Sequence, residues 1–232
     1  MASLLEICQD AIAGVQDNAI PSTIIGNSSP LSMLLKVCAQ DVGRSLERAY
    51  KWQALKKSYS FATSDGVTAY DVPEEMRRFV NMSIWSATDQ WPLINVGHAR
   101  YRELLSGIVV SSIRFQYEFS ANQINLNPAP AADSVNIVFD YFTSYFCETS
   151  GGTGLDRWAA DTDVSRLDGN LMSLGVRYRY LARQGLPYEE EKAEFLSAIS
   201  DLRADDQPLS VIDVGVIGQA WPVNVSDGSW GI

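Results

Sequence analysis

The sequence predicts an α+β protein, in which a helical bundle from the N- and C-terminal thirds carries an inserted antiparallel β module and an extended C-terminal arm. Apolar residues recur at helical spacing near both ends of the chain, whereas the middle alternates with a period of two. The final stretch is glycine-dotted and nearly uncharged, which suits neither pattern. We therefore expect a helical body in 1–57 and 155–206, a β-rich module in 58–150 and an arm in 207–232.

Two amphipathic helices are predicted before residue 58. Leu4, Cys8, Ala11 and Val15 mark the apolar side of the first. The second is expected from about Leu31 to Lys57, after a loop rich in Ser, Pro, Gly and Asn. Its polar face, expected to be solvated, carries Lys36, Arg44, Glu47, Arg48 and Lys51.

The β module is predicted from alternation and turn residues. Tyr59, Phe61 and Thr63 alternate with polar or small residues, and Ser64-Asp65-Gly66 is a turn signal. A short helix in HARYRELLSG interrupts the set, and Pro73-Glu74-Glu75 is expected to open another helix. Further strands are expected in VNMSIW, SIRFQYEF, QINLNP and SVNIVFDYFTSYF.

A helical hairpin is predicted from Ala160 to Ala204. The first helix has one apolar stripe, formed by Leu167, Leu171, Leu174, Tyr178 and Leu181. Ser165 and Asp168 are its expected N-terminal cap, and Gly185 and Pro187 end it. The second helix begins with three glutamates and has Phe195, Ile199 and Leu202 on its apolar side. The glycines from Gly151 to Gly154 are expected to form a flexible joint before this hairpin.

The C-terminal segment 207–232 is the strongest candidate for contact with a partner. Its only charged residues are Asp213 and Asp227, and the stretch VIDVGVIGQAWPVNV is apolar, dotted with glycine and too irregular for a helix. We expect it to be marginal alone and to gain order against a partner, since burial must offset the cost of ordering the backbone. A strap on its own domain is the alternative. The candidate partner-binding residues are Val211, Ile212, Val214, Ile217, Trp221, Trp230 and, outside the segment, Trp158.

Composition and motifs indicate no catalytic, cofactor or metal site. The single histidine, His98, is expected to cap a helix or lie at the surface, and three separated cysteines are expected to be buried, reduced thiols. Zinc-type ligand spacing and a phosphate-binding loop are both missing. A net charge of −10 argues against tight nucleic-acid binding, although DNA could slide past an acidic wall. Neither a signal peptide nor a membrane span is expected.

Four segments in order resemble the head-to-tail adaptor family of short-tailed bacteriophages, also called connector or tail tubular protein A-like proteins. They are LLEICQDAI, RAYKWQALKK leading into YSF, NLNPAPAADSVNIVFDY, and the ADTD to LPYEEE hairpin. The resemblance implies a structural virion protein, not an enzyme, that forms a ring, with a dodecamer expected, beneath the portal. Residues 1–57 and 155–206 would form the ring body.

The implied partners are the portal protein, neighbouring copies of the chain and a downstream tail or nozzle protein. DNA would pass through the channel without specific binding, and neither a membrane nor a cofactor is implied. The protein would lie in the virion neck or tail, after assembly in the host cytoplasm. Two alternatives remain open: a carbohydrate-binding tail module that uses the tryptophans, and a virion enzyme that degrades the cell wall with a carboxylate pair.

Overall fold

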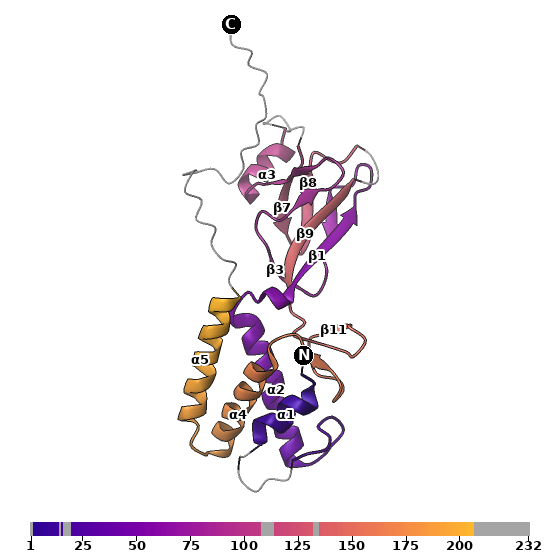
Figure 1. The fold of residues 1–232 in the computed structure, drawn as a ribbon. Helices are drawn as coiled ribbons and strands as arrows, with labels where there is room; N and C mark the ends of the chain where they lie inside the picture. The colour runs from indigo at the N-terminus through magenta and orange to yellow at the C-terminus, as the bar shows by residue number, and fades with distance from the viewer. Residues whose placement is uncertain (1, 14, 16–19, 108–113, 132–134, 207–232) are drawn as a thin grey trace.

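The computed structural model describes residues 2–13, 15, 20–107, 114–131 and 135–206. Within them the chain is a mixed α/β protein with five helices and three sheets of mostly antiparallel strands (Figure 1). The α-helices are α1 (Leu4–Ile12), α2 (Pro30–Ala49), α3 (His98–Leu105), α4 (Gly169–Gln184) and α5 (Glu189–Asp205). The strands are β1 (Lys56–Ala62), β2 (Ala69–Asp71), β3 (Met76–Phe79), β4 (Trp85–Ser86), β5 (Trp91–Pro92), β6 (Ile94–Asn95), β7 (Gln116–Ser120), β8 (Gln123–Asn127), β9 (Asn136–Thr143), β10 (Cys147–Glu148), β11 (Gly154–Leu155) and β12 (Val164–Ser165).

The predicted fold class, a helical bundle with an inserted β module, is wrong. The part of the chain that packs with the helices contains a sheet of its own, in the order β11-β10-β12. Phe146, Cys147 and Trp158, which lie in or beside this sheet, share one buried cluster with the inner faces of α1, α2 and α4. Sheet structure therefore runs through both hydrophobic clusters of the described chain, and the core is not that of a helical bundle.

Local capping explains where the helices begin. Ser3 and Glu6 form a reciprocal capping box on α1, with Ser3 N donating to Glu6 Oε2 at 2.8 Å. Ser29 caps α2, whose first residue is Pro30. Asp168 caps α4 through the backbone N–H of Leu171 at 2.8 Å. The expected second cap residue, Ser165, instead lies in β12.

The ends of the helices agree with the sequence in one case and differ in another. Gly185 ends α4 in the left-handed conformation, with φ of 70°, as its position predicts. By contrast, α2 ends at Ala49, eight residues before the expected Lys57. A 3₁₀ turn, Gln53–Leu55, follows, and β1 already begins at Lys56. The Trp52 indole donates to Leu46 O at 2.8 Å, which fixes this turn against the end of the helix.

The β-rich end consists of two sheets around a second cluster. β9 pairs antiparallel with β1, β3 and β4, and β5 extends that sheet. The other sheet has the order β2-β8-β7-β6, with a parallel pair between β6 and β7. Alternate residues of β8 and β9 are buried, as period-two sequences predict. The predicted strand VNMSIW is mostly wrong, because β3 ends at Phe79 and β4 begins at Trp85.

Two other local predictions are corrected. Glu74 and Glu75 open no helix but lie in a turn that leads into β3. The expected flexible joint is instead part of a β-hairpin: Gly151 and Gly152 lie in the turn between β10 and β11, and Gly154 begins β11. A bond from Thr149 N to Thr153 O at 2.8 Å closes the turn. The predicted helix in HARYRELLSG is confirmed as α3.

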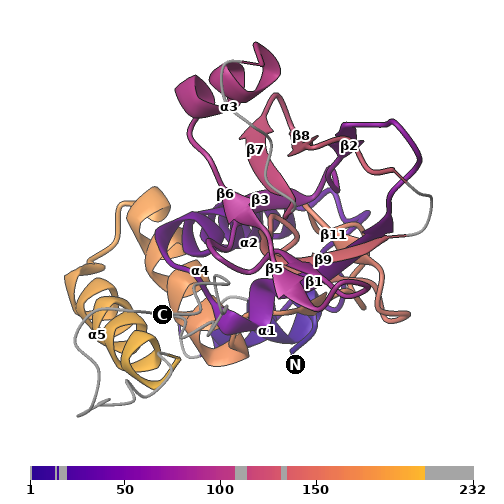
Figure 2. The same ribbon diagram turned by 90° about the horizontal axis from the view of Figure 1, so that it is seen from above.

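The molecule is elongated, with the helices and the small sheet at one end and the two larger sheets with α3 at the other (Figure 1). Seen along the long axis, α5 lies at one side and the β11 segment toward the other (Figure 2). No helix in the described part of the chain combines the length and the apolar character that a membrane crossing requires.

Polar contacts join the two ends of the molecule. Arg77 Nε lies 3.4 Å from the buried carboxylate of Glu47, at the end of α2. Arg78 Nη2 donates to Arg48 O at 2.7 Å. Because β3 contributes two consecutive arginines to the end of α2, the β-rich end is anchored by charge-assisted bonds as well as by the chain connections.

Candidate functional site

The predicted partner-binding residues have two different outcomes. Val211, Ile212, Val214, Ile217, Trp221 and Trp230 lie outside the described residues. Trp158 is described, and it is a core residue with 2% of its surface exposed. Its ring packs edge-to-face on Phe146, with centroids 5.8 Å apart. A buried indole of this kind stabilises the fold rather than presenting an anchor at the surface.

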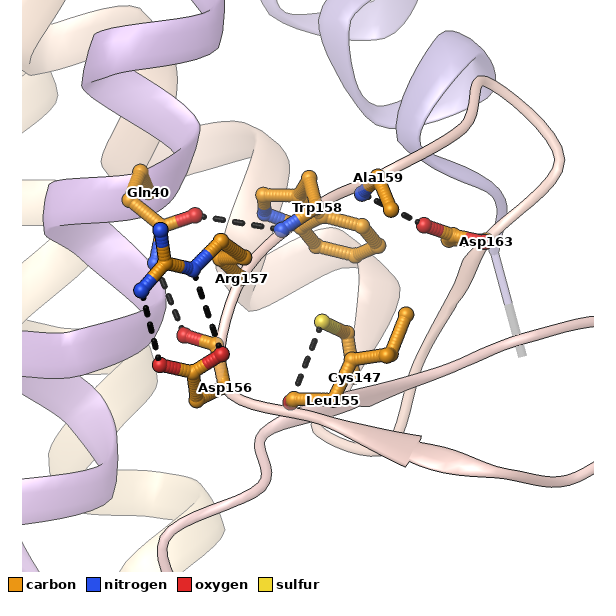
Figure 3. Close-up of polar contacts among 8 residues, drawn as sticks. All are labelled: Gln40, Cys147, Leu155, Asp156, Arg157, Trp158, Ala159 and Asp163. Atoms are coloured by element: carbon orange, nitrogen blue, oxygen red, sulfur yellow. Dashed lines mark hydrogen bonds and ion pairs between the residues drawn. The ribbon is translucent and has the colours of Figure 1, made fainter.

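Although Trp158 itself is buried, the loop that carries it, residues 156–163 between β11 and β12, borders a groove. Gln40 on α2 binds this loop through both the oxygen and the nitrogen of its side-chain amide (Figure 3). Its Oε1 accepts from Trp158 N at 3.2 Å, and its Nε2 donates to Asp156 O at 3.0 Å. The helix and the loop are thereby fixed side by side.

Two aspartates hold the other end of the same loop. Asp163 is 2% exposed, and its Oδ2 accepts from the backbone N–H groups of Ala159 and Ala160, both at 2.7 Å. The side chain of Asp161 accepts from the backbone N–H groups of Ile24 and Ile25. The sequence ADTD therefore serves as a backbone clamp, which agrees with the preference of Asp for turns. Both carboxylates are used within the fold.

The groove lies between α2 and this loop and has a volume of about 360 Å³. Its lining residues combine a small apolar surface with several cations: Lys36, Val37, Gln40, Asp41, Arg44, Arg157 and Trp158. Val37, 46% exposed, is the apolar residue that α2 contributes to the groove. Apolar floor and charged rim together are typical of a protein contact surface.

The charges around the groove are only partly matched within the described chain. Asp41 already binds Arg183 at 2.6 Å, and Arg179 lies 3.8 Å from the same oxygen. Arg157 pairs with its neighbour Asp156 at 3.3 Å (Figure 3). Lys36 and Arg44, by contrast, are exposed and form no ion pair with any described residue. The groove is a basic surface on a chain whose net charge is −10.

The groove wall also contains a polar atom without a partner. Trp158 Nε1 is buried, and no acceptor for it lies among the described residues. A buried donor left in this state costs about 1–3 kcal/mol.

A second candidate surface lies on the β-rich end. Four large apolar side chains are well exposed there; they are Met82, Trp85, Ile94 and Phe119. A cavity of about 280 Å³ opens among Met82, Pro92, Leu93, Ile94, Asn95 and Tyr117. The rings of Phe119 and Phe79 stack with centroids 6.2 Å apart, so the patch continues into the core of the sheets. We call this surface the β-end patch.

The single histidine contacts a buried carboxylate, and the three cysteines are buried. His98 begins α3, and its Nδ1 contacts the buried carboxylate of Glu118 on β7. The three cysteines are buried, free thiols. Burial raises the pKa of Cys8 and Cys147 to about 12 in each case. No cluster of three or more His, Cys, Asp or Glu side chains that could hold a metal ion occurs in the described ranges.

The acidic pairs are distributed rather than convergent. Glu75 Oε1 binds Lys57 Nζ at 2.9 Å and accepts from the Tyr141 hydroxyl at 2.8 Å. Glu189, Glu190 and Glu191 occupy the first turn of α5, where carboxylates favour the helix dipole. Each group thus has a local structural explanation.

No protein-family model matches the chain, and no curated protein matches its sequence. The resemblance to the phage adaptors therefore depends on the four segments and their order.

Proposed function

We propose that this chain is a structural head-to-tail adaptor of a short-tailed bacteriophage. Copies assemble as a ring under the portal, extend the DNA channel and provide the docking platform for tail components. The main observation behind the proposal is that one elongated chain has two separate candidate protein-binding surfaces. They are the basic groove on α2 and the β-end patch. A protein that joins two assemblies needs separate surfaces of this kind.

The chemistry of the surfaces supports this assignment. Exposed apolar side chains gathered around a cavity, as at Met82 and Ile94, mark protein interaction sites more often than random surface. We assign the β-end patch to the downstream tail or nozzle protein. The helical end, with the basic groove, is assigned to the ring and the portal. The segment 207–232 remains our candidate for contact with the portal or with a neighbouring copy.

The experiment is density-gradient sedimentation of the full chain with the portal ring of its own phage. Co-sedimentation with the ring is the expected result. A version that ends at Asp206 should keep its circular dichroism spectrum and lose portal binding, because the apolar segment 207–232 is missing. Portal binding that is unchanged by this truncation would remove the role of the segment. A full chain that never sediments with the ring would contradict the adaptor function.

The two alternatives have their own readouts. A cell-wall-degrading enzyme would release sugar fragments from purified peptidoglycan. A carbohydrate-binding module would show quenching of tryptophan fluorescence by host surface polysaccharide. We expect neither signal. Trp85, 36% exposed in the β-end patch, is the described tryptophan best placed to report such binding.

A further inference from the structure

Helix α2 carries a basic stripe at its surface, and Glu47, which falls within the same arc, is buried beside Arg77. Lys36, Arg44 and Arg48 are exposed, and at 100° per residue they fall within about 120° of the helix circumference. None of the three forms an ion pair with a residue that the structure describes. Lys36 and Arg44 also line the groove beside Trp158. This basic stripe extends about 18 Å along the helix.

Helix α5 carries the opposite pattern. Glu190, Glu194, Asp201 and Asp205 are exposed and fall within about 60° of the circumference, so they form a straight acidic stripe about 22 Å long. They too take part in no ion pair within the described ranges. The carboxylate that does pair, Glu191 with Arg177 at 4.0 Å, points toward α4. The acidic stripe therefore lies on another side of α5 than Glu191, and Asp205, at the end of the helix, also lines a pocket with Trp52 and Leu167.

The two stripes run in the same direction and at the same height. Arg179 and Arg183 on α4 contact Ser45 and Asp41 on α2, in that order, so α4 is antiparallel to α2. Helix α5 returns along α4 and is consequently parallel to α2. Gln53 N donates to the side chain of Asp206 at 2.9 Å, which sets the ends of α2 and α5 level.

Positions along the two helices, measured from these ends at 1.5 Å per residue, place basic and acidic side chains at similar levels. Asp201 and Asp205 lie near the level of Arg44 and Arg48. Glu194 lies about 16 Å below Asp205, and Lys36 lies about 20 Å below the end of α2. When two neighbouring copies are related by a rotation about an axis parallel to these helices, each residue keeps its position along that axis. It therefore brings like levels of two copies together, basic against acidic.

We infer that the basic stripe of one copy binds the acidic stripe of the next, so that this contact joins neighbouring copies in the ring. The inference rests on the proposed function, and it names the partner of the α2 groove as a second copy of this chain. Such a contact is head-to-tail, since the two surfaces differ, and its repetition closes a ring. Helix α5 and the β11 segment lie at opposite sides of the helical end (Figures 1 and 2), and Arg157 and Trp158, which line the groove with α2, follow β11 closely in the chain.

The first test uses the full chain without a portal. Equal amounts of ¹⁴N- and ¹⁵N-labelled protein are mixed at low salt and treated with a carbodiimide, which joins a lysine amine to a carboxylate in direct contact. We expect cross-links between Lys36 and Glu190 or Glu194 that combine one light and one heavy peptide. Their yield should fall with added salt, because exposed charge pairs are screened. The absence of mixed cross-links at any protein concentration would overturn the inference.

The second test uses charge reversal. One variant carries Lys36→Glu and Arg44→Glu, and the other carries Glu190→Lys and Glu194→Lys. Each alone should associate with itself at least about tenfold more weakly than wild type, because like charges oppose each other at the contact. A mixture of the two variants should recover association, since each supplies the complement of the other. Failure of the mixture to recover would contradict the pairing. Arg102→Glu on α3 and Glu74→Lys are controls at exposed positions on the β-rich end.

These outcomes separate the inference from the proposed function. Wild-type protein that binds the portal, while both variants assemble on it equally well, would overturn the interface and leave the adaptor function standing. Cross-linked copies that ignore the portal would support the interface and contradict the adaptor function. Retardation of duplex DNA that Lys36→Glu and Arg44→Glu abolish, without cross-links between copies, would assign the basic stripe to nucleic acid and overturn the inference.

Discussion

Gln40 holds the backbone at Trp158 with one end of its amide and the backbone at Asp156 with the other, at 3.2 Å and 3.0 Å. The loop has no regular secondary structure of its own at these residues, so this side chain supplies bonds that a helix or sheet would otherwise provide. The shape of the basic groove follows from this contact. Helix α2 and the loop form its two walls.

Replacing Gln40 with alanine should lower the free energy of unfolding by about 1–3 kcal/mol, because two hydrogen bonds to backbone groups are lost. Urea denaturation measures the change. Gln184→Ala, at an exposed position at the end of α4, is the matched control and should have little effect. Equal stability of the two variants would show that the clamp contributes nothing.

Trp158 should tolerate phenylalanine and not alanine. Phe keeps the aromatic contact with Phe146 and removes the buried N–H group that has no described acceptor, so we expect a change within about 1 kcal/mol. Ala leaves a cavity and should cost about 3–5 kcal/mol. Comparable large losses for both variants in thermal or urea unfolding would indicate that the indole nitrogen has a partner.

Gly43→Ala should destabilise the protein although alanine favours helix. A Cβ at Gly43 would lie 2.3 Å from Cε2 of Phe146, so the ring or the helix must shift. We expect a net loss of about 1–3 kcal/mol from overpacking, beyond the roughly 1 kcal/mol that alanine gains in helix propensity. Combination with Phe146→Leu should relieve the clash. Additive effects of the two substitutions in a double-mutant cycle would refute the contact.

Acid should weaken the contacts of Glu75 with Lys57 and Tyr141. Burial by itself would raise the pKa of this carboxyl, but the hydrogen bonds from Lys57 and Tyr141 and the charge of Lys57 together lower it. A carboxylate with a lowered folded-state pKa adds stability above its unfolded pKa, near 4.3, and loses that contribution as pH falls through the folded value. Glu75→Gln should therefore be less stable than wild type at pH 6–7, and the difference should shrink as the pH falls below about 4.3 and through the lowered folded-state pKa.

The stability of both proteins against pH, measured by urea denaturation, tests this expectation. Glu74→Gln, at the exposed neighbouring position, is the control and should follow the wild-type curve. A difference between Glu75→Gln and wild type that persists unchanged at low pH would show that the ionised carboxylate is not its source.

The three cysteines should resist alkylation in the native state. All are buried, and burial raises the pKa of Cys8 and Cys147 to about 12, so few thiolates form at pH 8. Mass spectrometry after iodoacetamide treatment should show unmodified native protein and three labels in urea. Rapid labelling of native protein that still has its full circular dichroism signal would contradict the packing of Cys8, Cys38 and Cys147.

The ends of the helices were easier to predict from the sequence than the way the helices pack together with the small sheet. Capping residues such as Asp168 and the stop at Gly185 act locally, so their sequence signals survive in the fold. The small sheet of β10, β11 and β12 has two-residue strands, too short for a visible period. Its position against α1 and α2 depends on contacts between distant residues, and this is why the helical-bundle prediction failed.

The groove could be predicted only in part. The exposed face of α2, with Lys36, Arg44 and Arg48, was evident from helical spacing. The role of Gln40 has no sequence signal, because a glutamine on a polar helix face has no pattern that indicates a contact 118 residues away. Trp158 was misplaced for the opposite reason: glycine-flanked, irregular surroundings suggested exposure, whereas the loop folds back onto Phe146.

The adaptor function is tested most directly by native mass spectrometry of the full chain, alone and mixed with the portal ring of its phage. We predict that the chain adds to the portal in one cooperative step to a single defined number of copies, with twelve expected from the family resemblance. A chain that leaves the portal ring at its own mass, at every protein concentration and ionic strength tried, would contradict the account.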